Sequence, residues 1–406
     1  MKFTSKTSEV IERAKKWSVQ NYYPFEVSIE DGEGVWLIDI EGNRFLDCLA
    51  CYSAVNFGYR HPKITAAAHE QLDRLPVLPR GGFHNSEVSW FYEELAMICP
   101  VPEPKVMPLN AGTEAVERGV KFSRKWGYRR KGIKLGKAEV ISVVNNFHGR
   151  TYAPLSLSAD PDYAEFGPFL PGIKNEAPFG NIDALDAAIT PRTVAVILEP
   201  VQGEAGAIVP CVGYLRDVRE LCYRNNVLMF VDEIQTGFCR TGRIFAGNYE
   251  EICPDGMFLG KALGGGVFGV SAVVVSKEIA DLIGRGDDGS TFGGIPLAAK
   301  VARAAIRVAI EERMSERAME MGDYILSSLR SICSPHVKEV RGRGLLIGIE
   351  LREFSPEARY FGEKLLELGV AMKDTHKRVL RVAPPLIISK EEADFLLNRV
   401  EDVLKK

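Results

Sequence analysis

Four short apolar runs, rich in β-branched residues, alternate with helical patterns through the middle of this 406-residue chain. Runs that are apolar at nearly every position are typical of strands that are buried on both faces of a sheet. When amphipathic helices separate such strands, the pattern indicates βαβ units and a mostly parallel sheet. The sequence therefore predicts an α/β fold whose large domain is built on this sheet. The four runs cover residues 138–144, 193–198, 227–231 and 270–275.

The two ends of the chain predict a second, smaller unit. Residues 298–310 form a long helical pattern that could bridge two domains, and strand and helix patterns mix after it. Near the other end, residues 34–42 are typical of a strand and turn of a hairpin, which we expect to pack with the C-terminal unit. We therefore predict an N-terminal segment over residues 1–55, a large domain over 56–300 and a small α+β domain over 301–406.

Composition limits the classes of partner. The chain is 46% hydrophobic and 26% charged, and its formal net charge of −3 argues against nucleic acid or an anionic membrane as the main partner. A basic run at residues 124–131 is interpreted as a solvated helix face. The eight cysteines are scattered along a chain too long to depend on a disulfide framework, which predicts reduced thiols in the cytoplasm and indicates no metal site. No signal peptide or membrane anchor is expected, because no apolar stretch has the required length.

Two residues carry the strongest chemical signal. Lys261 lies among glycines and apolar residues, a setting that lowers the pKa of an amine toward the neutral form that attacks aldehydes. Asp232 follows the apolar run 227–231, so we expect it at the carboxyl end of a buried strand, where open α/β sheets bind ligands. Alone, each has an ordinary interpretation as a loop lysine or a helix cap. Together they fit pyridoxal phosphate, whose aldehyde needs a lysine and whose ring nitrogen needs a carboxylate.

A phosphate site is predicted where the strand pattern of residues 105–110 gives way to a helical pattern. Gly112 and Thr113 would begin this helix, and their backbone N–H groups would face an anion. A plain strand-to-helix turn would explain the same two residues. The presence of Lys261 and Asp232 favours the phosphate.

Seven short motifs, spread along the chain, occur together in one family. They are Asn110-Ala-Gly-Thr-Glu-Ala115, Phe147-His-Gly-Arg-Thr151, Glu199-Pro-Val-Gln-Gly-Glu204, Asp232-Glu-Ile-Gln-Thr-Gly237, Gly260-Lys-Ala-Leu-Gly264, Ser290-Thr-Phe-Gly-Gly294 and Arg381-Val-Ala-Pro-Pro385. With these motifs, the chain from about residue 21 to about residue 400 resembles the class III (ω-amino acid) aminotransferases of fold type I, and within them the ornithine-specific branch. The resemblance implies a pyridoxal phosphate enzyme with a seven-stranded sheet in its large domain.

The resemblance also assigns residues around the cofactor. It implies that Phe147 and Ile234 enclose the pyridine ring, an arrangement that suits a flat apolar group, although both could be ordinary core residues. Gln235 would donate to the phenolate oxygen of the ring. Ser290 and Thr291 would bind the phosphate, with Thr291 reaching the site of the other subunit. The family pattern therefore implies a homodimer with two shared active sites.

Substrate choice is expected to depend on arginines, because a guanidinium group pairs bidentately with a carboxylate. The resemblance implies that Arg381 binds the α-carboxylate of 2-oxoglutarate. It also implies that Glu204 is a gate, which pairs with Arg381 while ornithine is bound. Arg150 and Tyr22 match the residues that take the α-carboxylate of ornithine, and Arg150 also matches the partner of the distal carboxylate of 2-oxoglutarate. Tyr52 belongs to a second substrate-facing tyrosine segment.

The implied reaction moves the δ-amino group of L-ornithine to 2-oxoglutarate and gives glutamate semialdehyde and glutamate, with Lys261 as the general base and acid. Glu199 is expected near Asp232. Acetylornithine, lysine and 4-aminobutyrate remain alternative amino donors, and a racemase, an aminomutase or a non-catalytic relative are further alternatives. Three features depart from the family pattern, Cys239, Ile295 and a lengthened stretch at residues 78–83, and we expect them near the subunit boundary or the pocket mouth.

Overall fold

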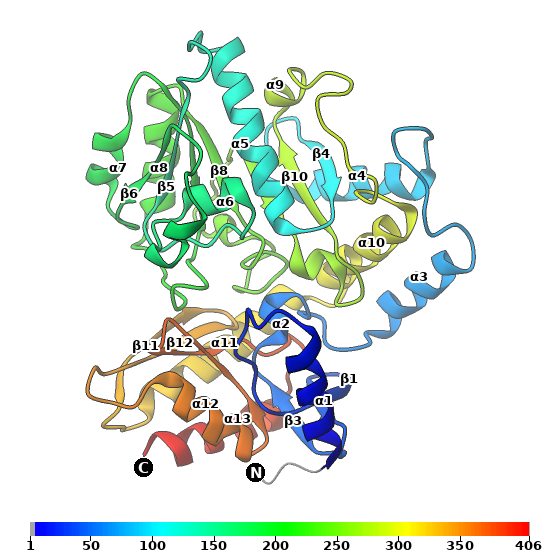
Figure 1. Cartoon of the computed structure of the whole chain (residues 1–406), viewed down its shortest axis with the longest axis vertical. Coiled ribbons are helices and arrows are strands. Elements are labelled where there is room, and N and C mark those ends of the chain that lie inside the picture. Colours follow the sequence, from blue (N-terminus) through cyan, green and yellow to red (C-terminus); the bar gives the residue numbers. More distant parts are fainter. Residues whose placement is uncertain (1–4, 406) are drawn as a thin grey trace.

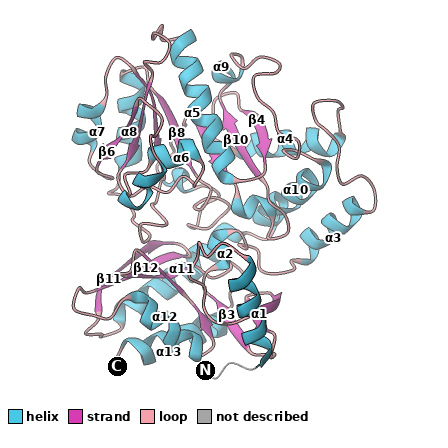
Figure 2. Ribbon diagram, in the orientation of Figure 1, coloured by secondary structure: helices cyan, strands magenta, loops and turns pink. Residues whose placement is uncertain are grey.

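A seven-stranded sheet forms the centre of the larger part of the molecule (Figures 1 and 2). The computed structural model describes residues 5–405. The strands are β4 (Lys105–Leu109), β5 (Glu139–Val143), β6 (Ile173–Ala177), β7 (Thr193–Leu198), β8 (Leu228–Asp232), β9 (Gly256–Leu259) and β10 (Ser271–Val275). Their order is β4-β10-β9-β8-β7-β5-β6, and only β10 runs antiparallel to its neighbours. The predicted mostly parallel sheet is confirmed.

Helices cover both faces of this sheet, which explains why its strands are apolar at successive positions. In β7, Ala195 and Ile197 belong to the cluster formed with α5 (Gly112–Arg129), whereas Val196 and Leu198 pack in the cluster of α8 (Tyr214–Arg224). Around β9 and β10 a third cluster includes residues of α3 (Pro62–Leu72), α4 (Ser86–Ile98) and α10 (Pro296–Glu311). Shorter helices complete this part: α6 (Tyr152–Leu157), α7 (Ile182–Ala188), α9 (Lys277–Ala280), η1 (Pro161–Phe166), η2 (Ala246–Tyr249) and η3 (Lys261–Gly264).

The smaller part of the molecule combines the two ends of the chain, which lie side by side in the lower half of Figure 1. One sheet has the order β1-β2-β3-β13 and the other has the order β11-β12-β15-β14. Because β3 pairs in parallel with β13, the N-terminal hairpin packs with the C-terminal unit, as the sequence predicted. The strands are β1 (Ile29–Glu33), β2 (Trp36–Asp39), β3 (Arg44–Asp47), β11 (Val337–Arg343), β12 (Leu346–Leu351), β13 (Val370–Ala371), β14 (Lys373–Thr375) and β15 (Val379–Val382). The helices are α1 (Ser5–Trp17), α2 (Ala50–Ser53), α11 (Met314–Ser331), α12 (Ala358–Glu367) and α13 (Lys390–Leu404).

The long helical pattern predicted over residues 298–310 is α10, which continues through residue 300. The division of the chain at residues 55 and 300 stays a prediction. Within the part of the chain that the structure describes, no helix has the length and apolar character needed to cross a membrane.

An unusual turn connects the N-terminal sheet to the large part of the molecule. Four successive residues, Ala50 to Ser53, have positive φ angles of 44°, 46°, 57° and 74°. Residues with a Cβ atom rarely adopt this left-handed conformation, which costs roughly 1–2 kcal/mol for each of them. Asp47 stabilises the turn, because its Oδ1 accepts from the backbone N–H groups of Leu49 at 2.8 Å and of Ala50 at 3.1 Å. Its other oxygen accepts from the hydroxyl of Tyr59 at 2.8 Å.

Cys239 and Ile295, which depart from the family pattern, lie in the core and line neither site cavity, so the expected place at the pocket mouth was wrong, whereas the expected place near the subunit boundary stays a prediction. Cys239 is fully buried and Ile295 is 2% exposed, and both belong to the hydrophobic cluster around α10. The thiol of Cys239 contacts Ser315 Oγ at 3.2 Å and packs as a small apolar side chain. Both residues therefore fill core space and do not face a pocket mouth.

A glycine in α5 allows the helix to approach the sheet, and its replacement should destabilise the protein. A methyl group at Gly119 would lie 2.2 Å from Cζ of Phe258, whose ring stacks on Phe230 with centroids 5.3 Å apart. Gly119→Ala should therefore cost about 1–3 kcal/mol through overpacking, although alanine normally stabilises a helix interior. The midpoint of thermal unfolding would fall. Gly81→Ala is the matched control because Gly81 has open space around it, and an equal midpoint for the two variants would contradict this packing.

Candidate active site

A cavity of about 150 Å³ opens where several strands of the large sheet end. Asp232 is the last residue of β8, Glu199 directly follows β7, and Lys261 lies two residues after β9. Because these strands run in parallel, their carboxyl ends bring the side chains together at one edge. All predicted cofactor residues except Ser290 and Thr291 line the cavity. Its lining consists of Gly112, Thr113, Phe147, His148, Gly149, Glu199, Asp232, Ile234, Gln235 and Lys261.

Asp232 is held by two contacts. Its Oδ2 lies 2.7 Å from His148 Nδ1, and its Oδ1 accepts from the backbone N–H of Ile234 at 3.1 Å. The His148 ring is buried, and its Nε2 has no hydrogen-bond partner among residues 5–405. His148 was not among the predicted site residues, although it lies in the motif Phe147-His-Gly-Arg-Thr151. A polar residue next to the predicted ring-packing Phe147 was the available signal.

Glu199 is a second carboxyl group buried beside Asp232. It accepts from the backbone N–H groups of Phe147 at 3.0 Å and Gly203 at 3.3 Å. Burial raises its pKa to about 7, and the negative charge of Asp232 acts in the same direction. Glu199 therefore carries only part of a negative charge at neutral pH. The predicted proximity of Glu199 and Asp232 is confirmed by the cavity that both residues line.

Lys261 begins η3 with a positive φ of 47°. Burial lowers the pKa of its amine, while the nearby carboxylate of Glu204 raises it. The net direction is downward, which is the direction that a reactive lysine requires. The structure thus places an amine with a lowered pKa in the same cavity as Asp232.

The start of α5 lines the cavity with backbone N–H groups that have no partner within the helix. Gly112 and Thr113 are the first two helical residues, so their N–H groups have no partner within the helix. A Cβ atom at Gly112 would lie 2.8 Å from Ile234 Cδ1, and one at Gly149 would lie 2.5 Å from Thr113 Oγ1. Because Gly112 and Gly149 have no side chains, the N-terminus of α5 stays accessible to an anion.

Ser290 and Thr291 do not line the cavity of their own chain. Ser290 Oγ accepts from Asn110 Nδ2 at 3.1 Å and from the backbone N–H of Gly293 at 3.0 Å, whereas Thr291 is exposed. Their assignment to a phosphate contact stays a prediction, because Thr291 would have to serve the site of a second subunit.

Arg381 and Glu204 form the ion pair that the gate requires. Arg381 lies on β15 and is 1% exposed, and its Nη1 is 2.6 Å from Glu204 Oε1. Gln235 Nε2 donates to the same oxygen at 3.1 Å. Burial alone would raise the pKa of Glu204, but Arg381 and then Lys261 lower it to about 2. The gate is therefore charged at any ordinary pH, and Gln235 contacts the gate as well as the cavity.

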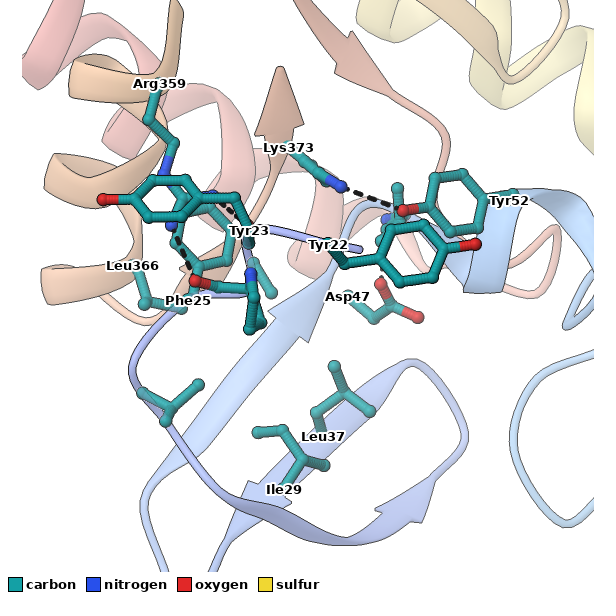
Figure 3. Close-up of a pocket in the computed structure, with 14 residues that line it drawn as sticks. Tyr22, Tyr23, Phe25, Ile29, Leu37, Asp47, Tyr52, Arg359, Leu366 and Lys373 are labelled. Carbon is teal, nitrogen blue, oxygen red and sulfur yellow. Dashed lines mark hydrogen bonds between the residues drawn. The ribbon is translucent and has the colours of Figure 1, made fainter. Parts of the chain in front are cut away.

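Two of the remaining predicted substrate residues, Tyr22 and Tyr52, lie around a second cavity of about 520 Å³ (Figure 3). Tyr22 and Tyr52 line it, and the guanidinium of Arg150 lies 5.5 Å from the centre of the Tyr22 ring and 5.7 Å from that of Phe147. The Tyr52 ring lies 5.1 Å from the guanidinium of Arg381. The two arginines thus lie against different aromatic rings, Arg150 against Tyr22 and Phe147 and Arg381 against Tyr52.

The residues around the smaller cavity fit pyridoxal phosphate. A space of about this volume can accommodate one aromatic ring. Asp232 offers a carboxylate for a ring nitrogen, Lys261 offers an amine for an aldehyde, and the start of α5 offers N–H groups for a phosphate. Gln235 and His148, which also line the cavity, each keep a buried polar atom, Oε1 and Nε2, without a hydrogen-bond partner among the described residues.

Comparison with known proteins identifies the family. The model of the family "Aminotransferase class-III" matches residues 18–404. The chain belongs to the class III aminotransferases. An ornithine aminotransferase of Geobacillus sp. (strain WCH70) is 48% identical over 400 residues, which cover 98% of this chain and 99% of that protein. The crystal structure of the ornithine aminotransferase from Toxoplasma gondii ME49 has a TM-score of 0.95 and 38% identity, and covers 99% of this chain and 96% of that one. An acetylornithine aminotransferase from Elizabethkingia anophelis has a TM-score of 0.88 and 37% identity, with 99% of each chain covered.

This class III aminotransferase is a pyridoxal phosphate enzyme of the mixed α/β fold that the sequence predicted. The amine, the carboxylate and the helix N-terminus of the smaller cavity fit the cofactor of this family. The roles of individual residues follow from the geometry and are argued under the proposed function.

Replacement of Asp232 should impair cofactor function much more than folding. Asp232→Asn keeps the shape of the side chain but removes its charge, so the rate of amino transfer should fall on the order of 10²-fold or more. The midpoint of thermal unfolding should change little, because the amide can still accept from Ile234 N. Asp186→Asn, at an exposed position, is the control. An Asp232→Asn enzyme with an unchanged rate would rule out a role for this carboxylate at the ring nitrogen.

Proposed function

We propose that this aminotransferase moves the δ-amino group of L-ornithine to 2-oxoglutarate and releases glutamate semialdehyde and glutamate. The observation that carries the proposal is the pairing of Glu204 with Arg381, which covers one carboxylate site while Arg150 remains available as another. The names of the Geobacillus and Toxoplasma relatives support ornithine as the donor.

Ornithine requires this arrangement because it has two amino groups and one carboxylate. If Arg381 bound the α-carboxylate, the α-amino group would be held next to Lys261 and the wrong nitrogen would be transferred. With Glu204 on Arg381, the carboxylate instead goes to Arg150 and Tyr22, and the δ-amino group reaches Lys261. Thr375 supports the gate, because its hydroxyl donates to the backbone carbonyl of Glu204.

2-Oxoglutarate places different demands on the same residues. It carries two carboxylates, so Glu204 has to leave Arg381 before that guanidinium can bind the α-carboxylate, while Arg150 takes the distal one. The Nε of Arg381 is buried without a hydrogen-bond partner among the described residues, and a substrate carboxylate would supply that partner. The gate thus allows one pocket to accept two substrates of different charge in turn.

Lys261 and Asp232 perform the chemistry that is common to both substrates. When bound, pyridoxal phosphate supplies the aldehyde and an electron-withdrawing ring. Lys261, with its lowered pKa, would be the base that removes a proton from the substrate carbon and the acid that returns it. Asp232, oriented by His148, keeps the ring nitrogen protonated. Phe147, Ile234 and Gln235 line the same cavity, where the first two would exclude water from the ring and Gln235 would donate to its phenolate oxygen.

A cytoplasmic homodimer is part of the proposal. The exposed position of Thr291 supports a contact with the phosphate of a second subunit. All eight cysteines are free thiols, which fits a reducing compartment. Sedimentation of the cofactor-loaded protein would measure its assembly state, and a monomer with full activity would contradict the shared sites.

Acetylornithine is the second candidate donor, favoured by the Elizabethkingia structure. The two donors differ at the α-nitrogen, which is charged in ornithine and acylated in acetylornithine. The visible absorbance band of the cofactor-loaded protein should decrease when ornithine is added alone and return with 2-oxoglutarate. A decrease with N-acetylornithine, L-lysine or 4-aminobutyrate, and none with ornithine, would retain the mechanism and change the donor.

Lys261→Ala should abolish turnover, because no other amine lines the cavity of about 150 Å³ among the residues described. Steady-state assays with ornithine and 2-oxoglutarate would measure the loss. Lys277→Ala, which removes an exposed lysine of α9, should retain the full rate. Measurable transamination by the Lys261→Ala protein would remove the central assignment.

Glu204→Ala should shift the preference from the δ-amino group of ornithine toward the α-amino group of glutamate, because Arg381 would then be free for α-carboxylates. The ratio of the two half-reaction rates measures this preference, with the exposed Glu176→Ala as the control. In the wild type the ratio should stay constant from about pH 6 to about pH 9, since a pKa of about 2 keeps Glu204 ionised throughout. An unchanged ratio in Glu204→Ala would exclude the gate.

A further inference from the structure

The hydroxyl of Tyr52 has a cationic partner that the residues assigned above do not include. Lys373 Nζ donates to Tyr52 Oη at 3.1 Å, and the ammonium lies 5.7 Å from the centre of the ring (Figure 3). The two residues are 321 positions apart in the chain. The contact therefore exists only because the C-terminal unit folds against the segment that follows the N-terminal hairpin.

The chemistry of this contact fixes the direction of the hydroxyl. An ammonium group has three donors and no acceptor, so Tyr52 Oη must be the acceptor. The proton of the tyrosine hydroxyl is then available to a different group. No described residue accepts it, and Tyr52 and Lys373 both line the cavity of about 520 Å³. Tyr52 thus presents a hydrogen-bond donor to the cavity, which suits a carboxylate and not an ammonium group.

The same strand connects Lys373 to the gate. Lys373 is the first residue of β14 and lies opposite Arg381 in the antiparallel pair with β15. Thr375, which follows Lys373 by two residues on β14, donates from its hydroxyl to the backbone carbonyl of Glu204. The Tyr52 ring lies close to both cations, with its centre 5.7 Å from Lys373 Nζ and 5.1 Å from the guanidinium of Arg381. A change at Lys373 would therefore alter how Tyr52 covers Arg381.

Lys373 also has no carboxylate partner within salt-bridge distance in the described part of the chain. Asp47, the acidic residue that lines the same cavity, is occupied by Leu49, Ala50 and Tyr59. A cation that is partly removed from water and lacks a carboxylate attracts one from a ligand. The cavity would then favour the carboxylate of a substrate over its free ammonium group.

We propose that Lys373 is a positioning residue that sets the amino-donor preference, by holding the Tyr52 ring over Arg381 and turning the Tyr52 hydroxyl proton toward the substrate carboxylate. This inference rests on the proposed function, because it assumes that the carboxylate end of the donor occupies the larger cavity. It adds to the Glu204 gate a second determinant that acts through Tyr52.

The test is a double-mutant cycle on the cofactor-loaded enzyme. Lys373→Met keeps the length of the side chain and removes its donors, and Tyr52→Phe removes the hydroxyl. The ratio of kcat/KM for ornithine to kcat/KM for glutamate should fall about tenfold in each single variant. The double variant should be no worse than either single variant, since both remove the same contact. Lys373→Arg should restore most of the ratio.

Lys377→Met, at an exposed position of the same hairpin, is the matched control and should leave the ratio unchanged. A Lys373→Met enzyme with the wild-type ratio, or losses that add in the double variant, would overturn the inference. A merely structural lysine would lower stability and both kcat/KM values together. If the wild-type enzyme accepts another donor in place of ornithine, the proposed function fails, and the same cycle with that donor still decides the role of Lys373.

Discussion

Three carboxyl groups are buried at the ends of two neighbouring strands, and the loops around the active site are arranged to satisfy them. Glu199, Asp232 and Glu233 are 5%, 3% and 0% exposed. Without partners, such burial would cost several kcal/mol per charge. Glu199 binds the backbone N–H groups of Phe147 and Gly203, and Glu233 binds those of Ala246 and Gly247. The carboxyl groups thus fix the loops that carry the aromatic wall and the Glu204 gate.

Burial also limits how much negative charge this cluster can hold. It raises the pKa of both Glu199 and Glu233 to about 7, so neither is fully ionised at neutral pH. Asp232 is the member of the cluster that faces an imidazole, and it lines the cavity with Lys261. Burial therefore limits the negative charge that Glu199 and Glu233 add beside the contact between His148 and Asp232.

The sequence predicted features that depend on local pattern and missed those that depend on contacts between distant segments. Strand β7 matches its predicted run, and Asp232 and Lys261 were found because each lies in a distinctive local setting. The run predicted over residues 138–144 contains β5, which ends at Val143, so a loop carries the Phe147 ring. His148 and Lys373 act on residues 84 and 321 positions away, so no short-range spacing reveals them. Glu204 and Arg381 pair across 177 positions, so this contact too has no short-range signal in the sequence. Both residues were predicted only through the family resemblance.

The left-handed turn at Ala50–Ser53 has an evolutionary consequence. The direction of the Tyr52 side chain is determined by four unfavourable backbone conformations, which Asp47 stabilises through two N–H groups. Transplanting a tyrosine alone into a relative with a relaxed backbone at this place would not reproduce the orientation of its ring. A change of amino donor that acts through Tyr52 therefore requires coordinated changes in the loop at Ala50–Ser53 and at Asp47. Such a change is hard to reach by single substitutions.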